Sequence, residues 1–286
     1  MTVRQFSYRP WFFVAAVASM LAFSAMPIHA QENEEAAEIH DEEHETPHYP
    51  LEVPERQSWS FAGPFGTYDA AQLQRGLQVY RQVCGVCHGL ERVAFRTLAD
   101  ENGPFISEDE MRAIAAAYRV LDDQTDELRE ARPADYFPTP NFLGNPPDLS
   151  LMAKARASGD GFSWLFDWIR QYQESGVNYI YALLTGYGQD VPEGIDVAPG
   201  TFYNPYFLSG AAIGMPPPLT DGRIAYSDGT PETLEQYAVD VTAFLMWTAE
   251  PTLVDRKWLG FLVMVFLVVL AGLAYFAKRA VWAKVH

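Results

Sequence analysis

Cysteine is scarce in this sequence. The chain of 286 residues has two cysteines, Cys84 and Cys87, and six histidines. A structural zinc site needs two further Cys or His ligands at matching spacing, and the histidines away from the cysteines (His29, His40, His44, His48 and His286) do not form a suitable pair. A thioredoxin-type dithiol is also disfavoured, because such a motif is found in a βαβ pattern and no such pattern surrounds residue 84.

Basic residues are also few. Lys and Arg number 20 against 37 Asp and Glu, which gives a formal net charge of −17. Residues 31–50 alone contain eight acidic residues and no Lys or Arg. Phosphate binding requires the opposite sign, so we expect no nucleic-acid partner. The excess of acid instead favours a basic protein partner, attracted over a distance that shrinks as salt rises.

The first residues are typical of an export signal. Arg4 and Arg9 precede an apolar stretch over residues 11–23, and small residues follow up to Ala30. This pattern predicts a signal peptide over 1–30, cleaved after Ala30, with an uncleaved anchor as the alternative. Residues 31–57 are charged and poor in apolar side chains, which predicts a flexible acidic leader.

The other long apolar run lies near the C-terminus. Residues 258–277 contain no charge, and 20 residues of helix span a hydrocarbon core of about 30 Å. Lys278, Arg279 and Lys284 follow without any acid, which places residues 278–286 in the cytoplasm. We therefore expect a periplasmic domain over 58–252, held on the bacterial inner membrane by one transmembrane helix.

The two cysteines form a motif with the next residue. Cys84-x-x-Cys87-His88 is the attachment pattern of c-type haem. Two thiols three residues apart can each form a thioether to one haem, and His88 can then take an axial position on the iron. The motif predicts one covalent haem c, held through Cys84 and Cys87.

The second axial position is open to several residues. A Met or His there makes an electron carrier, and Met raises the potential. The histidines of the mature exported part other than His88 lie in the acidic leader, which disfavours them. Met152 lies in a helical pattern, whereas Met215 stands between Gly214 and three prolines, 216–218, in a rigid extended segment. We favour Met215 over Met152.

Apolar periodicity predicts a mostly α-helical fold. Asp69 is placed to cap a helix running to Val83, and Ser107 with Glu110 forms a capping box for a helix to Val120. Further helices are expected over residues 149–157, 162–172, 179–186 and 231–248. Residues 122–132 are expected to form a surface loop, with a helix as the alternative, and residues 187–226 a long loop rich in Gly and Pro.

The order of several short stretches resembles the cytochrome c1 family, the c-haem subunit of the cytochrome bc1 complex. The matching stretches are Arg75-Gly76, the haem motif, Asp135-Tyr136-Phe137-Pro138, Pro146-Pro147-Asp148-Leu149-Ser150, Ala155-Arg156, Leu184-Thr185-Gly186-Tyr187, Tyr203-Asn204-Pro205-Tyr206-Phe207, Met215-Pro216-Pro217, Asp228-Gly229-Thr230-Pro231 and Ala249-Glu250-Pro251. The resemblance implies a class-I cytochrome c-like haem domain with long loops and insertions, plus one C-terminal transmembrane helix.

The resemblance also implies the residues of the site. His88 and Met215 would be the two iron ligands, and Arg156 would lie near a haem propionate. Asn141, Pro147 and the Asn204–Phe207 stretch, with Tyr206 in it, would line the haem crevice. Phe162 stands where family members have a tyrosine six residues beyond the arginine, and residues 163–178 look inserted.

The function implied is electron transfer within a quinol–cytochrome c oxidoreductase. The chain would be a redox subunit without an acid–base catalyst of its own, in a dimeric complex with cytochrome b and the Rieske iron–sulfur protein. It would take an electron from the Rieske protein and pass it to a basic cytochrome c. The alternative is a free-standing, membrane-anchored cytochrome c that carries electrons to an oxidase or a reaction centre.

Overall fold

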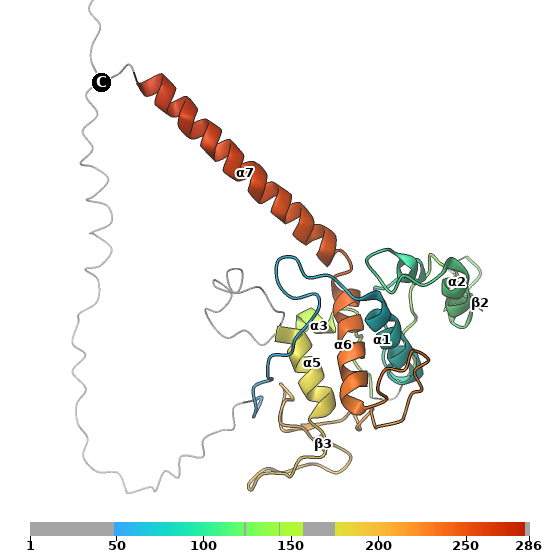
Figure 1. Ribbon diagram of the computed structural model, residues 1–286. Coiled ribbons are helices and arrows are strands. Elements are labelled where there is room, and N and C mark those ends of the chain that lie inside the picture. Colours follow the sequence, from blue (N-terminus) through green and yellow to red (C-terminus); the bar gives the residue numbers. More distant parts are fainter. Residues whose placement is uncertain (1–48, 123, 143, 157–174, 284–286) are drawn as a thin grey trace, which may run out of the picture. The chain divides into compact units, whose positions relative to one another are not determined.

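The structure is a computed structural model that describes residues 49–122, 124–142, 144–156 and 175–283. The expected signal peptide, most of the acidic leader, the helix expected over 162–172 and most of the apparent insert lie outside these residues. The described part is mostly helical, as expected, and contains two pairs of short strands (Figure 1).

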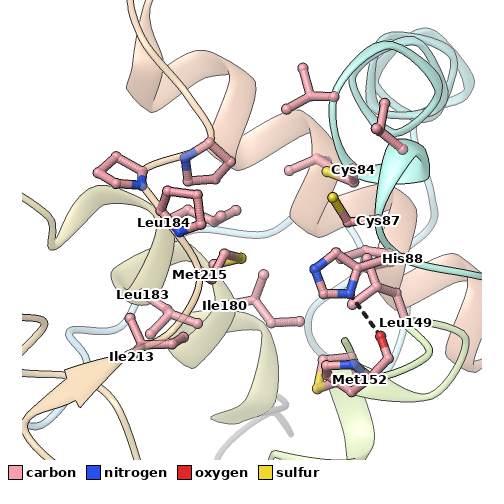
Figure 2. Close-up of a pocket in the computed structure, with 18 of the residues that line it drawn as sticks. Cys84, Cys87, His88, Leu149, Met152, Ile180, Leu183, Leu184, Ile213 and Met215 are labelled. Carbon is pink, nitrogen blue, oxygen red and sulfur yellow. Dashed lines mark hydrogen bonds between the residues drawn. The ribbon is translucent and has the colours of Figure 1, made fainter. Parts of the chain in front are cut away.

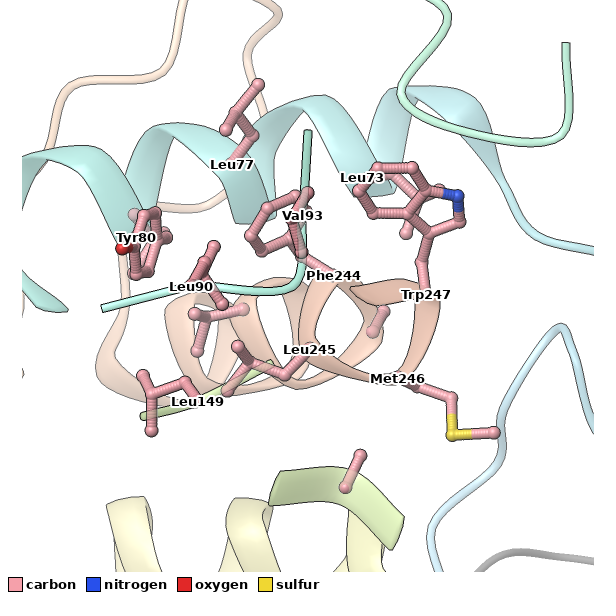
Figure 3. Close-up of a cluster of buried hydrophobic side chains, with 14 of the residues drawn as sticks. Leu73, Leu77, Tyr80, Leu90, Val93, Leu149, Phe244, Leu245, Met246 and Trp247 are labelled. Atoms are coloured by element: carbon pink, nitrogen blue, oxygen red, sulfur yellow. The ribbon is translucent and has the colours of Figure 1, made fainter. Parts of the chain in front are cut away.

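The centre of the core is a pair of helices from distant parts of the chain. Helix α1 (Ala70–Gln82) packs against α6 (Leu234–Ala249), and both begin at a side-chain cap, Asp69 and Thr233 respectively. The buried side chains between them include Leu73, Tyr80, Phe244 and Trp247 (Figure 3). The helix expected over 231–248 starts three residues later than predicted, at Leu234, because the side chain of Thr233 caps its first turn.

The two helices are in close contact at Gly76. A Cβ atom there would lie 2.2 Å from the carbonyl oxygen of Asp240 and 2.6 Å from Cβ of Phe244, so only glycine fits. Beside this contact, Arg75 donates from Nε to the fully buried carboxylate of Asp240 at 2.9 Å. Tyr226 also donates to Asp240, at 2.9 Å. A buried carboxylate needs such partners, since its ionised form is otherwise strongly disfavoured away from water.

A third helix covers the other side of α6. Helix α5 (Ser175–Thr185) packs against both α6 and the short helix α3 (Met152–Ala155). At Gly176 a Cβ atom would lie 1.9 Å from the carbonyl oxygen of Ala153, so α5 meets α3 through backbone. The helix expected over 149–157 is shorter than predicted, and the one expected over 179–186 starts earlier.

The segment after α1 contains the largest departure from the expected elements. The 3-10 helix η3 (Phe95–Ala99) precedes α2 (Glu108–Ala116), which begins at the expected Ser107 cap. The prediction that this helix continues to Val120 was wrong, because β1 (Arg119–Leu121) pairs antiparallel with β2 (Leu128–Glu130). Each strand has only three residues and an exposed–intermediate–exposed pattern, which is too short for an alternation to stand out.

An ion-pair cluster closes this hairpin. Arg129 in β2 bonds to Asp122 and to Asp135, the latter at 2.5 Å. The hydrogen bond from Arg129 lowers the pKa of Asp135 to about 2, so that this carboxylate is ionised at neutral pH. The hairpin is thereby joined to the Asp135–Pro138 stretch that leads toward the site.

The long loop over 187–226 is irregular over most of its length, as expected. It contains one short antiparallel pair, β3 (Phe202–Tyr203) with β4 (Ala212–Ile213). Next to this pair the buried Asn204 donates from its side chain to the carbonyl of Leu183 at 2.8 Å. The loop is thus attached to α5 through a satisfied buried amide.

The last helix contains the apolar run. Helix α7 (Leu253–Trp282) has a mean hydropathy of 2.6 over its most apolar window and is long enough to cross a membrane. It is the one such helix among the described residues. It extends beyond the expected span of 258–277 at both ends, because the polar residues that flank the run are compatible with helix.

Candidate functional site

The Cys–His motif forms a single tight turn after α1. The 3-10 turn η2 (Cys84–Val86) lets the backbone N–H groups of Cys87 and His88 both donate to the carbonyl of Cys84, at 3.1 and 2.9 Å. Residues three and four apart in a helical turn project from the same side. Both cysteines are free thiols, and Figure 2 shows them beside His88.

His88 is oriented by two hydrogen bonds. Its Nδ1 lies 2.7 Å from the carbonyl oxygen of Pro147. A carbonyl only accepts, so Nδ1 carries the proton and Nε2 keeps its lone pair for a metal. The hydroxyl of the buried Tyr80 donates to the backbone carbonyl of His88 at 2.9 Å. Burial raises the pKa of Tyr80, so the phenol stays protonated and remains a donor.

An apolar cavity of about 370 Å³ lies in front of this turn. Its walls come from the haem motif, α3, α5, α6 and the 213–218 segment. The residues that line it include Val83, Cys84, Cys87, His88, Pro147, Leu149, Met152, Arg156, Tyr179, Ile180, Leu183, Leu184, Phe207, Ile213, Met215, Pro216, Arg223, Val241 and Leu245.

Met215 lies on the wall opposite the motif. In Figure 2 its thioether points across the cavity toward His88, whereas Met152 lies beside Leu149 on the His88 side. The hydroxyl of Tyr187 donates to the backbone carbonyl of Met215 at 3.1 Å. The structure thus brings Met215 to the same cavity as Cys84, Cys87 and His88. Met215 follows His88 by 127 residues in the sequence and lies on the opposite side of the cavity.

The other expected residues divide into two groups. Pro147 and Arg156 line the cavity, but Asn141 and Tyr206 are not among the lining residues. Asn141 is in an exposed loop. The ring of Tyr206 packs against Gly186, and its neighbour Phe207 is the residue of this stretch that lines the cavity.

Tyr179 is one of the cavity residues that were not predicted from the sequence. Tyr179 in α5 is 3% exposed, lines the cavity and lies within electrostatic reach of Arg156. Phe162, where the family tyrosine was expected, lies outside the described residues.

The chemistry of Cys84 does not fit a redox dithiol. Burial raises the pKa of its thiol to about 12, so it is protonated at neutral pH. Nucleophilic cysteines have lowered pKa values, because the thiolate is the reactive form. The described residues also contain no cluster of three His, Cys, Asp or Glu side chains that could hold a metal ion.

The residues present do fit a haem. The cavity is lined mainly by apolar side chains, two free thiols lie at its edge, a histidine offers a lone pair, and a thioether faces it from the opposite wall. Arg156 supplies a cation at the rim for a carboxylate. A mostly helical domain with this site is a c-type cytochrome.

Comparison with known proteins identifies the kind of c-type cytochrome. The model of the Cytochrome C1 family matches residues 59–285. Cytochrome c1 from Blastochloris viridis is 48% identical over 250 residues, which cover 82% of this chain and 88% of that protein. Mitochondrial cytochrome c1 from Saccharomyces cerevisiae is 40% identical over 243 residues, covering 80% of this chain and 72% of the relative.

A further relative is longer. Cytochrome b/c1 from Bradyrhizobium diazoefficiens is 50% identical over 248 residues, which cover 82% of this chain but only 36% of that protein. The chain belongs to the cytochrome c1 family, the haem-containing electron-transfer subunit of the bc1 complex.

Proposed function

We propose that this chain carries one covalent haem c, takes an electron from the Rieske iron–sulfur protein and passes it to a basic cytochrome c. The observation that carries the proposal is the pairing of His88 and Met215 across one apolar cavity. A bound haem supplies an iron that cycles between Fe(II) and Fe(III). The chain's own residues hold that iron in place and shield it from water.

Each side chain at the motif has a distinct task. Cys84 and Cys87 would form the two thioethers, and His88 would bind the iron through Nε2. The bond from His88 Nδ1 to the carbonyl of Pro147 fixes the ring orientation and increases the basicity of the ligand nitrogen. Met215 would bind from the opposite wall, and a thioether ligand favours the reduced iron and so raises the potential.

The rim residues act on the cofactor's carboxylates. Arg156 would pair with a propionate, which offsets the cost of partly burying a negative charge. Tyr179, which also lines the cavity and lies within electrostatic reach of Arg156, would contact the same end of the cofactor. Asn141 and Tyr206 are left out of this set, because neither lines the cavity.

The partners follow from charge and from the membrane helix. The acidic excess of the chain suits a basic cytochrome c, and transient redox contacts of this kind gain on-rate from complementary charge. We place the haem domain in the periplasm and the C-terminus in the cytoplasm, because Lys278, Arg279 and Lys284 follow the apolar run without any acid. Cytochrome b and the Rieske protein would be the partners in the membrane complex.

Replacement of Met215 tests the site. Met215→Leu should abolish the low-spin, high-potential haem spectrum while both thioethers remain, and Met152→Leu is the matched control that should leave it unchanged. Redox-titrated visible spectra of the purified complex measure both variants. If Met152→Leu gave the loss and Met215→Leu did not, the ligand assignment would be wrong.

The free-standing shuttle makes a different prediction for purification. In gentle detergent this chain should copurify with a b-type cytochrome and an iron–sulfur protein that has the Rieske spectrum. Isolation of this chain alone, with its haem intact, would favour the shuttle.

A further inference from the structure

An uncharged aromatic turn lies beside the start of α7. Residues 58–68 contain no charged side chain. Within them, the N–H of Thr67 donates to the carbonyl of Ser60 at 3.1 Å, which closes a loop with Pro64 and Phe65 at its tip. We call residues 60–67 the aromatic turn.

The tip has a backbone that depends on two glycines. Gly63 has φ of 75°, in the region that side chains disfavour. A Cβ atom at Gly66 would lie 2.0 Å from the carbonyl oxygen of Ala62. The turn is therefore a built feature, with one large apolar side chain, Phe65, left 67% exposed at its end.

Phe65 is in contact with the apolar part of α7. Its ring lies 5.5 Å from that of Phe261, edge to face at 71°. Phe261 also stacks on Trp258 at 5.8 Å. Phe261 is three residues inside the apolar run, about 5 Å along a helix from Trp258. A side chain that touches Phe261 is therefore near the edge of the hydrocarbon core wherever α7 crosses a membrane.

Three further bonds hold the turn and the start of α7 to the domain. The amine of Lys257 donates to the carbonyl of Phe61. The hydroxyl of Tyr68 donates to the carbonyl of Glu250 at the end of α6, at 3.0 Å. The side chain of Asn102 donates to Asp255 in the first turn of α7, at 3.0 Å. The turn is thus fixed to both the core and the membrane helix.

We propose that the aromatic turn inserts Phe65 into the lipid interface, as a second membrane contact of the haem domain beside α7. Aromatic rings favour this layer, and an exposed apolar tip continuous with a membrane helix gains free energy by leaving water. A domain held at two points has less freedom to tilt than one held by a single helix, so the contact restricts where the haem domain lies above the bilayer. This inference rests on α7 being the membrane anchor.

A unique thiol can test the depth of the turn. Under the proposed function the two native cysteines are bound to haem in the assembled protein, so Phe65→Cys and Pro64→Cys each add one reactive thiol for a nitroxide label. Pro64→Cys keeps the Phe65 ring in place. The full complex is reconstituted in vesicles of phosphatidylcholine and phosphatidylglycerol, and power-saturation EPR compares collisions with oxygen and with a water-soluble nickel chelate.

Two control positions bracket the result. The side chain of Val53 is 73% exposed, so Val53→Cys is the water-facing control. Met264 lies inside the apolar run of α7, so Met264→Cys is the control within the membrane. Labels at 64 and 65 should show several-fold fewer nickel collisions than at 53, oxygen collisions above those at 53, and a depth shallower than at 264. The visible haem spectrum of each variant confirms that it has folded.

Two results would overturn the proposal. Nickel accessibility at 64 and 65 equal to that at 53 would place the turn in water. Low accessibility to both reagents would show that another protein subunit covers it. A water-accessible label at Met264→Cys would instead contradict the membrane anchor itself, so the two failures can be told apart.

Discussion

At the scale of single residues, the site contains a repeated arrangement of two tyrosines, one buried (Tyr80) and one half-buried (Tyr187). Tyr80 donates its hydroxyl to the carbonyl of His88 at 2.9 Å, and Tyr187 donates to the carbonyl of Met215 at 3.1 Å. Burial raises the pKa of both phenols, so both stay protonated donors. Each proposed iron ligand therefore has its backbone, rather than its ligand atom, held by a tyrosine.

Removal of the second hydroxyl should weaken the methionine side of the site. The segment around Met215 cannot be held by donors from Pro216, Pro217 or Pro218, which have no N–H. We predict that Tyr187→Phe lowers the reduction potential and speeds displacement of the thioether by added imidazole, measured by redox titration and stopped-flow absorbance. If Tyr187 positions Met215, the reduction potential and the rate of displacement should change while the melting temperature stays close to that of the parent protein.

Tyr80→Phe is the matched control for this prediction. It removes a hydroxyl of the same kind from the histidine side, where the bond to Pro147 still orients the ring. It should lower stability, by about 1 kcal/mol for one lost hydrogen bond, and leave the imidazole kinetics unchanged. Equal kinetics in Tyr187→Phe and the parent protein would show that Met215 does not depend on this bond.

The sequence predicted the candidate iron ligands but not the tyrosines that bond to their backbone carbonyls. Cys84, Cys87 and His88 form a contiguous motif, and Met215 was distinguished by the prolines beside it. Tyr187 and Tyr179 carry no such signal, because their bonds join residues that are distant in the chain. Of the predicted Asn204–Phe207 stretch, Phe207 is the residue that lines the cavity.

At the scale of elements, the contact between α1 and α6 decides whether the domain forms. The helices meet through Gly76, where a methyl group would overlap the backbone of α6 at Asp240. The same stretch positions Cys84, since the haem motif begins two residues after α1 ends. Any displacement of α1 would therefore also move the site.

A methyl group at Gly76 should be costly. We predict that Gly76→Ala lowers the free energy of unfolding by about 1–3 kcal/mol or more, as overpacking of a core does, and reduces haem incorporation. Urea titration of the haem spectrum in detergent measures the first, and the ratio of haem to protein the second. Gly210→Ala is the control, because nothing lies within 4 Å of a Cβ atom there. Similar stability for both variants would contradict the close contact.

The helices with a strong apolar periodicity were predicted from the sequence, and the strands of two or three residues were not. The helices at 70–82 and 234–249 have clear apolar faces and caps, so their positions followed from the sequence to within three residues. The β1–β2 hairpin was missed because three-residue strands give no measurable alternation. The β3–β4 pair was missed for the same reason, inside a loop whose Gly and Pro content predicted irregular chain.

At the scale of the whole molecule, the dominant property is negative charge. The net charge is −17, and the acidic residues are spread along the sequence between residues 31 and 250, not confined to residues 31–50. A charge of this size steers an oppositely charged partner over roughly the Debye length, about 10 Å at 0.1 M salt. The proposed acceptor should therefore be found by long-range attraction before any specific contact forms.

The salt dependence of electron transfer tests this property with two acceptors of opposite sign. From about 10 mM to about 200 mM salt, the second-order rate of oxidation by a basic cytochrome c should fall by at least about tenfold, because screening removes the attraction. The rate with ferricyanide, an anion repelled by the same field, should rise over the same range. Stopped-flow measurement of the reduced haem follows both reactions. A fall with both acceptors would mean that salt acts on the haem site itself, and no change with either would mean that the acidic surface does not reach the place where electrons leave.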